Sequence, residues 1–155
     1  MARIEEHIEI AASPSIVFQF CHDLARRREW DERVVRMELL TTEPVRRGTL
    51  LRIDAGRRGE YLFSWDAEYV EYQFPSGSTL KVLDAAPSSP FGAGSEEAWQ
   101  FSRTGSGTQF SACWDYKPRG FLNRLADALG QRASNRRALR RSLANVKKLI
   151  ESGRR

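Results

Sequence analysis

Hydrophobic and polar residues alternate along most of the chain from Arg33 to Lys117, and from Phe121 to Ile150 hydrophobic residues recur every three or four positions. Alternation with period two is typical of strands with one buried face, and the longer spacing is typical of an amphipathic helix. The pattern therefore predicts an antiparallel sheet followed by one long C-terminal helix. Each of these elements can bury its apolar face only against the other.

The first thirty residues predict a strand and two short helices. Residues 3–11 alternate, Ser13-Pro14 places an N-cap residue before a proline at the first helical position, and Asp23 can cap a second helix that ends near Trp30. Six further strands are expected at 34–42, 49–55, 60–74, 78–84, 96–102 and 108–117. Residues 86–94 (APSSPFGAG) are too rich in Pro and Gly for a strand, and we predict a mobile loop there.

The positive charge of the chain belongs to its C-terminal part. From Arg119 onward the chain contains eleven Lys and Arg residues and two acidic residues, Asp127 and Glu151, so its local net charge is +9. The rest of the chain carries a net charge of −4. A basic helix can contact phosphates or an anionic membrane, which predicts a weak membrane contact. It can equally be a solvated outer face that keeps the protein soluble.

Length and composition predict a single cytoplasmic domain spanning residues 1–155. Cys21 and Cys113 are too few for a disulfide framework, no apolar run reaches the roughly 18 residues of a membrane span, and the N-terminal MARIEEHIEI lacks the apolar core of a signal peptide. His7 and His22 have no ligand partners at metal-binding spacing. Nucleotide-binding motifs are also missing, so we expect no metal, no cofactor and no specific nucleic-acid partner, and a monomer or a homodimer.

The inward faces of the predicted strands are rich in aromatic residues, as in the last strand, where Phe110, Trp114 and Tyr116 share one face. The strands and the 86–94 loop supply these candidate ligand-binding residues: Met37, Phe63, Trp65, Tyr69, Leu80, Val82, Phe91, Trp99, Phe101, Phe110, Trp114 and Tyr116. Their rings either line a cavity or fill the core. Buried Trp and Tyr need partners for their polar edges, which slightly favours the cavity. We expect the loop to gate it, with Phe91 as the plug.

The predicted C-terminal helix supplies the opposite wall. Leu125 and Leu129 lie on its apolar stripe, and the same stripe passes Arg132 and Arg136, so all four are candidate ligand-binding residues. A guanidinium that faces an apolar cavity is costly unless it is paired. Such a guanidinium can therefore anchor an anionic ligand, pair with Glu97 or another buried acid, or reach solvent at the open end of the cavity.

Five segments in a fixed order resemble the polyketide cyclase/dehydrase branch of the START-like (SRPBCC) superfamily. These are ASPSIVF at 12–18, Asp23 followed by Trp30-Asp31, Gly48 before a strand, GTQF at 107–110 and NVKKLIE at 145–151. The resemblance covers nearly the whole chain and implies the helix-grip, or Bet v 1-like, α+β fold. In that fold a seven-stranded antiparallel sheet wraps around a long C-terminal helix, and two short helices connect the first and second strands.

The resemblance leaves three functions open, because the superfamily includes polyketide aromatase/cyclases, lipid carriers and hormone receptors. The first is binding or transport of a small hydrophobic molecule, lipid-like or aromatic. The second is a cyclase, aromatase or dehydratase acting on a poly-β-ketone, with Tyr69, Tyr116 and Arg136 as weak catalytic candidates that donate to enolate oxygen. Aromatase/cyclases imply a cation after the Trp of the long strand; Trp65 matches, but Tyr69 stands in the cationic place. The third is an interaction protein that uses the basic helix.

Overall fold

The computed structural model describes residues 2–57 and 60–153. The N-terminal elements are β1 (Ala2–Ile10), α1 (Pro14–Cys21), the short 3-10 turn η1 (Leu24–Arg26) and α2 (Arg27–Trp30). The strands that follow are β2 (Val34–Leu39), β3 (Leu50–Arg57), β4 (Glu60–Gln73), β5 (Gly77–Ala85), β6 (Glu96–Arg103) and β7 (Thr108–Tyr116). The last elements are α3 (Gly120–Ala126), the π-helical segment η2 (Asp127–Gln131) and α4 (Arg132–Ser152).

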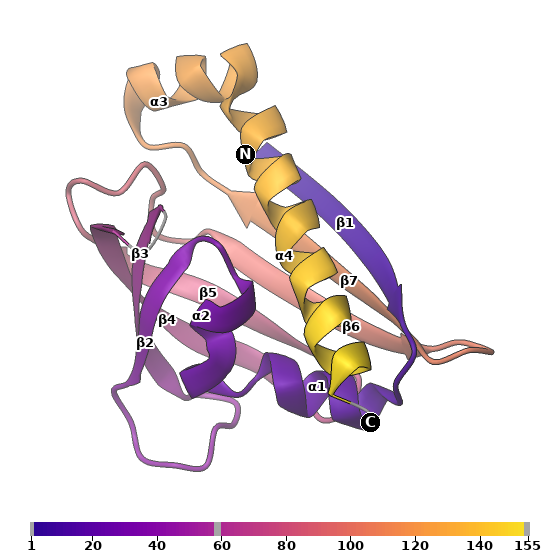
Figure 1. The fold of residues 1–155 in the computed structure, drawn as a ribbon. Coiled ribbons are helices and arrows are strands. Elements are labelled where there is room, and N and C mark those ends of the chain that lie inside the picture. The colour runs from indigo at the N-terminus through magenta and orange to yellow at the C-terminus, as the bar shows by residue number, and fades with distance from the viewer. Residues whose placement is uncertain (1, 58–59, 154–155) are drawn as a thin grey trace.

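The strands form one seven-stranded antiparallel sheet in the order β1-β7-β6-β5-β4-β3-β2. Consecutive strands from β2 to β7 are neighbours, so only the connection from β1 to β2 crosses the sheet. The short helices α1 and α2 lie in that connection and link the two edges (Figure 1). The curved sheet and the long helix α4 confirm the predicted helix-grip fold.

The two short helices begin where the sequence predicts. The Ser13 hydroxyl accepts a hydrogen bond from the amide of Ile16 at 3.4 Å, with Pro14 at the start of α1. The Asp23 carboxylate accepts from the amide of Ala25 at 3.2 Å and caps the next turn. These caps satisfy amide groups that have no partner within the helices.

Helix α4 packs on only one half of the sheet. Its residues Leu139, Leu143, Val146 and Ile150 join a core formed with α1, β1, β6 and β7. A second core, centred on Leu51, is formed by side chains of strands β2, β3, β4 and β5. Because α4 belongs to the first core alone, the second half of the sheet is less closely covered.

The expectation of one uninterrupted C-terminal helix is wrong. Gly130 has a φ of 141°, a conformation that favours glycine, and the chain changes direction there between α3 and α4. As a result, α3 and η2 lie beyond the end of the sheet (Figure 1), and Leu125 and Leu129 are exposed instead of facing it. Within the described residues, no helix is both long and apolar enough to span a membrane.

Candidate ligand-binding cavity

A cavity of about 1110 Å³ lies between the N-terminal half of α4 and the β2–β4 half of the sheet. Its volume lies just above the range of roughly 300–1,000 Å³ that is typical of ligand sites. Gln131 and the α4 residues Ser134, Asn135, Ala138 and Arg141 form one wall. These residues lie on a different face of the helix from Leu139 and Leu143, so packing of α4 against β1 turns polar and small side chains toward the cavity.

Aromatic rings form the opposite wall and the floor. Phe63 and Trp65 of β4, Phe91 of the 86–94 loop and Trp114 of β7 all line the cavity. The ring centroids of Phe91 and Trp114 are 4.7 Å apart, and those of Phe63 and Trp65 are 5.6 Å apart. A small pocket of about 20 Å³, lined also by Leu80 and Val82, shares Trp65, Phe91 and Trp114 with the main cavity. The space therefore offers several ring faces to a flat or apolar molecule.

A buried network of four charged side chains lies beside this wall. Asp31 accepts hydrogen bonds from Arg27 at 2.6 and 2.9 Å and from Arg33 at 3.0 and 3.1 Å. Glu97 accepts from the same two guanidinium groups, each at 3.1 Å, and from the Trp99 indole at 2.9 Å. Two positive and two negative charges thus balance, which is the condition for holding ions in an interior.

The electrostatics of the network follow from this arrangement. Burial alone would raise the pKa of the Asp31 carboxyl, but the nearby Arg33 and Arg27 outweigh burial and hold that pKa below its usual value. Burial opposes the charge of Arg33 as well, and Asp31 and Glu97 overcome it and raise the pKa of Arg33. The Asp31 carboxylate and the Arg33 guanidinium therefore both stay ionised at neutral pH.

Arg33 is a cation that the network presents to the cavity. Its guanidinium lies 4.8 Å from the Trp114 ring, and Arg33 lines both the main cavity and the small pocket. Its Nε and one terminal nitrogen, Nη2, bind Asp31 and Glu97, while Nη1 makes no hydrogen bond to a described residue. This nitrogen can donate to a carbonyl, hydroxyl or carboxylate oxygen of a bound molecule.

The structure brings only part of the predicted ligand-binding set to the cavity. Phe63, Trp65, Leu80, Val82, Phe91 and Trp114 line the main cavity or the small pocket. Trp99, Phe101 and Phe110 belong to the core beneath α4, whereas Tyr69 and Met37 belong to the core of the β2–β5 half. The alternation of residues identified the inward face of each strand correctly. It does not distinguish aromatic rings that fill the core from rings that line the cavity.

Arg132 and Arg136 were predicted to bind the ligand, but each lies against an acidic side chain of the protein. Arg132 donates to Asp127 at 2.7 and 3.1 Å, and the buried Tyr116 hydroxyl donates to the same carboxylate. Burial and this hydrogen bond raise the pKa of Tyr116 to about 12. Arg136 lies 3.9 Å from Glu6 of β1, so of the alternatives open to it, the pairing with Glu97 does not occur. Tyr69, Tyr116 and Arg136 do not meet at one point.

Sequence reasoning missed Arg33 and the cavity-facing residues of α4. A signal for Arg33 was available: Arg27 and Arg33 stand four residues before and two after Asp31. Their pairing with Glu97 depends on α2 packing over β6, which no local pattern specifies. In the described part of the chain, no three His, Cys, Asp or Glu side chains gather as metal ligands would.

The pH dependence of stability should report on His22, which is buried among the rings of Phe18, Tyr72 and Trp99. Nδ1 lies 2.8 Å from the Phe18 carbonyl and Nε2 lies 2.7 Å from the Ser78 hydroxyl, so the neutral ring donates through Nδ1–H and accepts at Nε2. Burial lowers the pKa of His22 to about 4. Between this value and about 6.5, the usual pKa of an unfolded His, the folded state therefore binds fewer protons than the unfolded state.

We expect the free energy of unfolding to fall by about 3 kcal/mol from this group as the pH drops from about 7 to about 4. Urea denaturation across this range measures the loss. His22→Gln, which removes the titrating ring, should flatten the dependence, whereas His7→Gln at an exposed position of β1 should not. An unchanged slope in His22→Gln would show that His22 is not its source.

Comparison with known proteins agrees with this architecture. The family model described as polyketide cyclase / dehydrase and lipid transport matches residues 1–151. The search of curated proteins returns no significant match.

Several solved structures share the fold at low sequence identity. The Zhui aromatase/cyclase from Streptomyces sp. R1128 is 16% identical with a TM-score of 0.74, and the match covers 99% of this chain and 96% of that one. The protein TTHA0849 from Thermus thermophilus is 20% identical with a TM-score of 0.73, covering 99% and 98%. The major latex-like protein 151 from Panax ginseng is 12% identical with a TM-score of 0.70, covering 98% and 96%. The family match over nearly the whole chain shows that this protein belongs to the polyketide cyclase/dehydrase and lipid transport family.

Proposed function

We propose that the protein binds and carries a small hydrophobic molecule, lipid-like or aromatic, in the cavity between α4 and the β2–β4 half of the sheet. The observation that carries this proposal is the cavity of about 1110 Å³ with aromatic walls and the inward-facing cation of Arg33. The ligand stacks on Phe63, Trp65 and Trp114 and accepts a hydrogen bond from Arg33 through an oxygen. Burial of roughly 300 Å² of apolar ligand surface would contribute about 7 kcal/mol before the cost of association.

The second candidate function is cyclisation of a poly-β-ketone, which the family description and the aromatase/cyclase neighbour favour. Here Arg33, which precedes β2 and lines the same pocket as Trp65, would take the place that the resemblance assigns to a cation of the long strand. A cyclase also needs a group that removes a proton. Asp31 and Glu97 each accept from two arginines and Glu32 accepts from Arg141, so their oxygens are already engaged by cations. Glu60, which also lines the cavity, is exposed to solvent at the start of β4. Binding without turnover is therefore the better supported function.

Titration with anilinonaphthalene sulfonate (ANS) tests the binding function directly. The probe combines fused aromatic rings with an anionic group, so it matches the rings and the Nη1 nitrogen of Arg33. We expect one saturable site with enhanced ANS fluorescence, and displacement of ANS by a naphthoic acid. Weak ANS fluorescence that does not saturate and does not fall when a competitor is added would contradict a specific binding site in the cavity.

A further inference from the structure

Four large apolar side chains on α3 and η2 are exposed to solvent. Phe121, Leu122, Leu125 and Leu129 have 76%, 78%, 44% and 77% of their surface accessible. Their spacing places them within about one third of the helix circumference, so they form a single face, the α3 apolar face. An apolar face of this kind on a segment that projects beyond the sheet marks an interaction surface.

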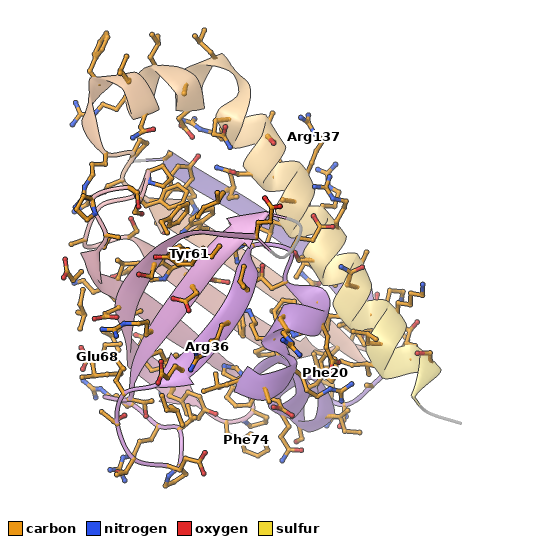
Figure 2. The ribbon with its side chains drawn as sticks, turned by 60° about the vertical axis from the view of Figure 1, so that its left-hand side comes forward. Phe20, Arg36, Tyr61, Glu68, Phe74 and Arg137 are labelled. Atoms are coloured by element: carbon orange, nitrogen blue, oxygen red, sulfur yellow. The ribbon has the colours of Figure 1, made fainter. Side chains whose placement is uncertain are left out.

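The surroundings of the α3 apolar face are basic. Arg119 and Arg124 flank it, and Arg132, Arg136 and Arg137 follow on the next turns, with Arg137 pointing away from the sheet (Figure 2). The acidic residue within 119–150, Asp127, is buried and bound by Tyr116 and Arg132. A second copy docked on the same face would bring like charges together, whereas an anionic lipid surface would neutralise them.

The face also adjoins the cavity. The chain between β7 and α3 is hydrogen-bonded to the loop that carries Phe91, through Gly92 N–H to Lys117 O at 2.9 Å and Arg119 N–H to Pro90 O at 2.8 Å. On the other side, Gln131 ends η2 and lines the cavity. The α3 apolar face and the part of the cavity lined by Pro90, Phe91 and Gln131 are thus close together at one end of the molecule.

We propose that α3 and η2 dock on an anionic membrane surface, with the α3 apolar face inserted among the lipid headgroups and the flanking arginines on the phosphates. This is the arrangement of an interfacial amphipathic helix. Docking would hold this end of the cavity at the bilayer, where an apolar ligand could enter or leave without crossing water. Only this last step rests on the proposed function.

Co-sedimentation with vesicles of equimolar phosphatidylcholine and phosphatidylglycerol tests the docking. We expect the full chain to bind these vesicles, to bind pure phosphatidylcholine vesicles more weakly, and to lose affinity at high salt. Leu122→Glu combined with Leu129→Glu should weaken binding at least about tenfold. The matched control is Leu40→Glu with Leu83→Glu, which makes the same charge change at two other exposed leucines and should bind much more strongly.

A second measurement does not depend on a loss of binding. Phe121→Trp should give tryptophan emission that shifts to shorter wavelength on addition of the mixed vesicles, because the ring enters an apolar environment. No shift, or equal binding by the α3 variant and its control, would overturn the proposal. So would a wild-type dimer that the α3 variant converts to a monomer without any vesicle binding, since a second copy would then cover the face. ANS binding by the α3 variant keeps this result separate from the test of the cavity.

Discussion

Replacement of Asp31 by Asn should lower the free energy of unfolding by about 3–5 kcal/mol, because it leaves Arg27 and Arg33 buried with one carboxylate between them. The Asp31 side chain is fully buried and its oxygens accept from both guanidinium groups, so water cannot replace the lost charge. Urea denaturation at neutral pH measures the change.

An exposed ion pair of the same chemistry provides the control. Asp66 accepts from Arg52 at 2.9 and 3.1 Å on the outer surface of the sheet. Asp66→Asn removes a two-bond contact with one arginine, and exposed pairs are screened by water, so the loss should be much smaller. Equal losses in Asp31→Asn and Asp66→Asn would mean that the buried network does not hold α2 and β6 together.

Replacement of Ala138 by Trp should weaken ANS binding at least about tenfold while leaving the fold intact. Ala138 lines the cavity from α4, so the indole would occupy space that the ligand needs and would pack against the aromatic wall. The same change at Ala133, which lies on the exposed face of the same helix, is the matched control. We expect Ala133→Trp to bind ANS as the wild type does.

The two outcomes separate a cavity from a surface. If both variants retain wild-type affinity, the probe binds elsewhere. If Ala138→Trp unfolds the protein, the interior is more tightly packed than a cavity of about 1110 Å³ allows, and the proposed binding site is again contradicted. Thermal denaturation of each variant, recorded alongside the titrations, distinguishes these cases.

Much of the fold could be predicted from the sequence because local patterns determine it. Alternation along the strands placed Phe110, Trp114 and Tyr116 on the buried face, and all three are buried there. Ser13 and Asp23 cap the turns that follow them, as their positions indicate. These features depend on residues close together in the chain.

The bend at Gly130 could not be predicted in the same way. Spacing of three and four runs on from Leu125 and Leu129 to Leu139 by way of Arg132 and Arg136, so periodicity predicts one continuous helix across Gly130. A single glycine is tolerated inside many helices, and nothing in the sequence shows that this one takes a positive φ. Periodicity therefore predicted the leucines before the bend as cavity residues, and the structure instead leaves them exposed.

The cavity depends on contacts between distant segments. Arg33 lies beside Trp114 and Glu97 only because β2 and β7, at different places in the sheet, curve toward the same space. Whether the rings leave a space depends on how far α4 stands from β2–β4, and residue types do not encode that distance. The sequence therefore predicted that aromatic side chains face inward, but it did not predict the volume of the cavity.

Native mass spectrometry of the protein purified from its own host tests the central claim most directly. We predict a bound apolar compound of small-molecule mass, released on denaturation and missing from protein that carries Ala138→Trp. Repeated recovery of wild-type protein with no bound compound, together with failure to bind ANS, would contradict the claim that the cavity holds a ligand.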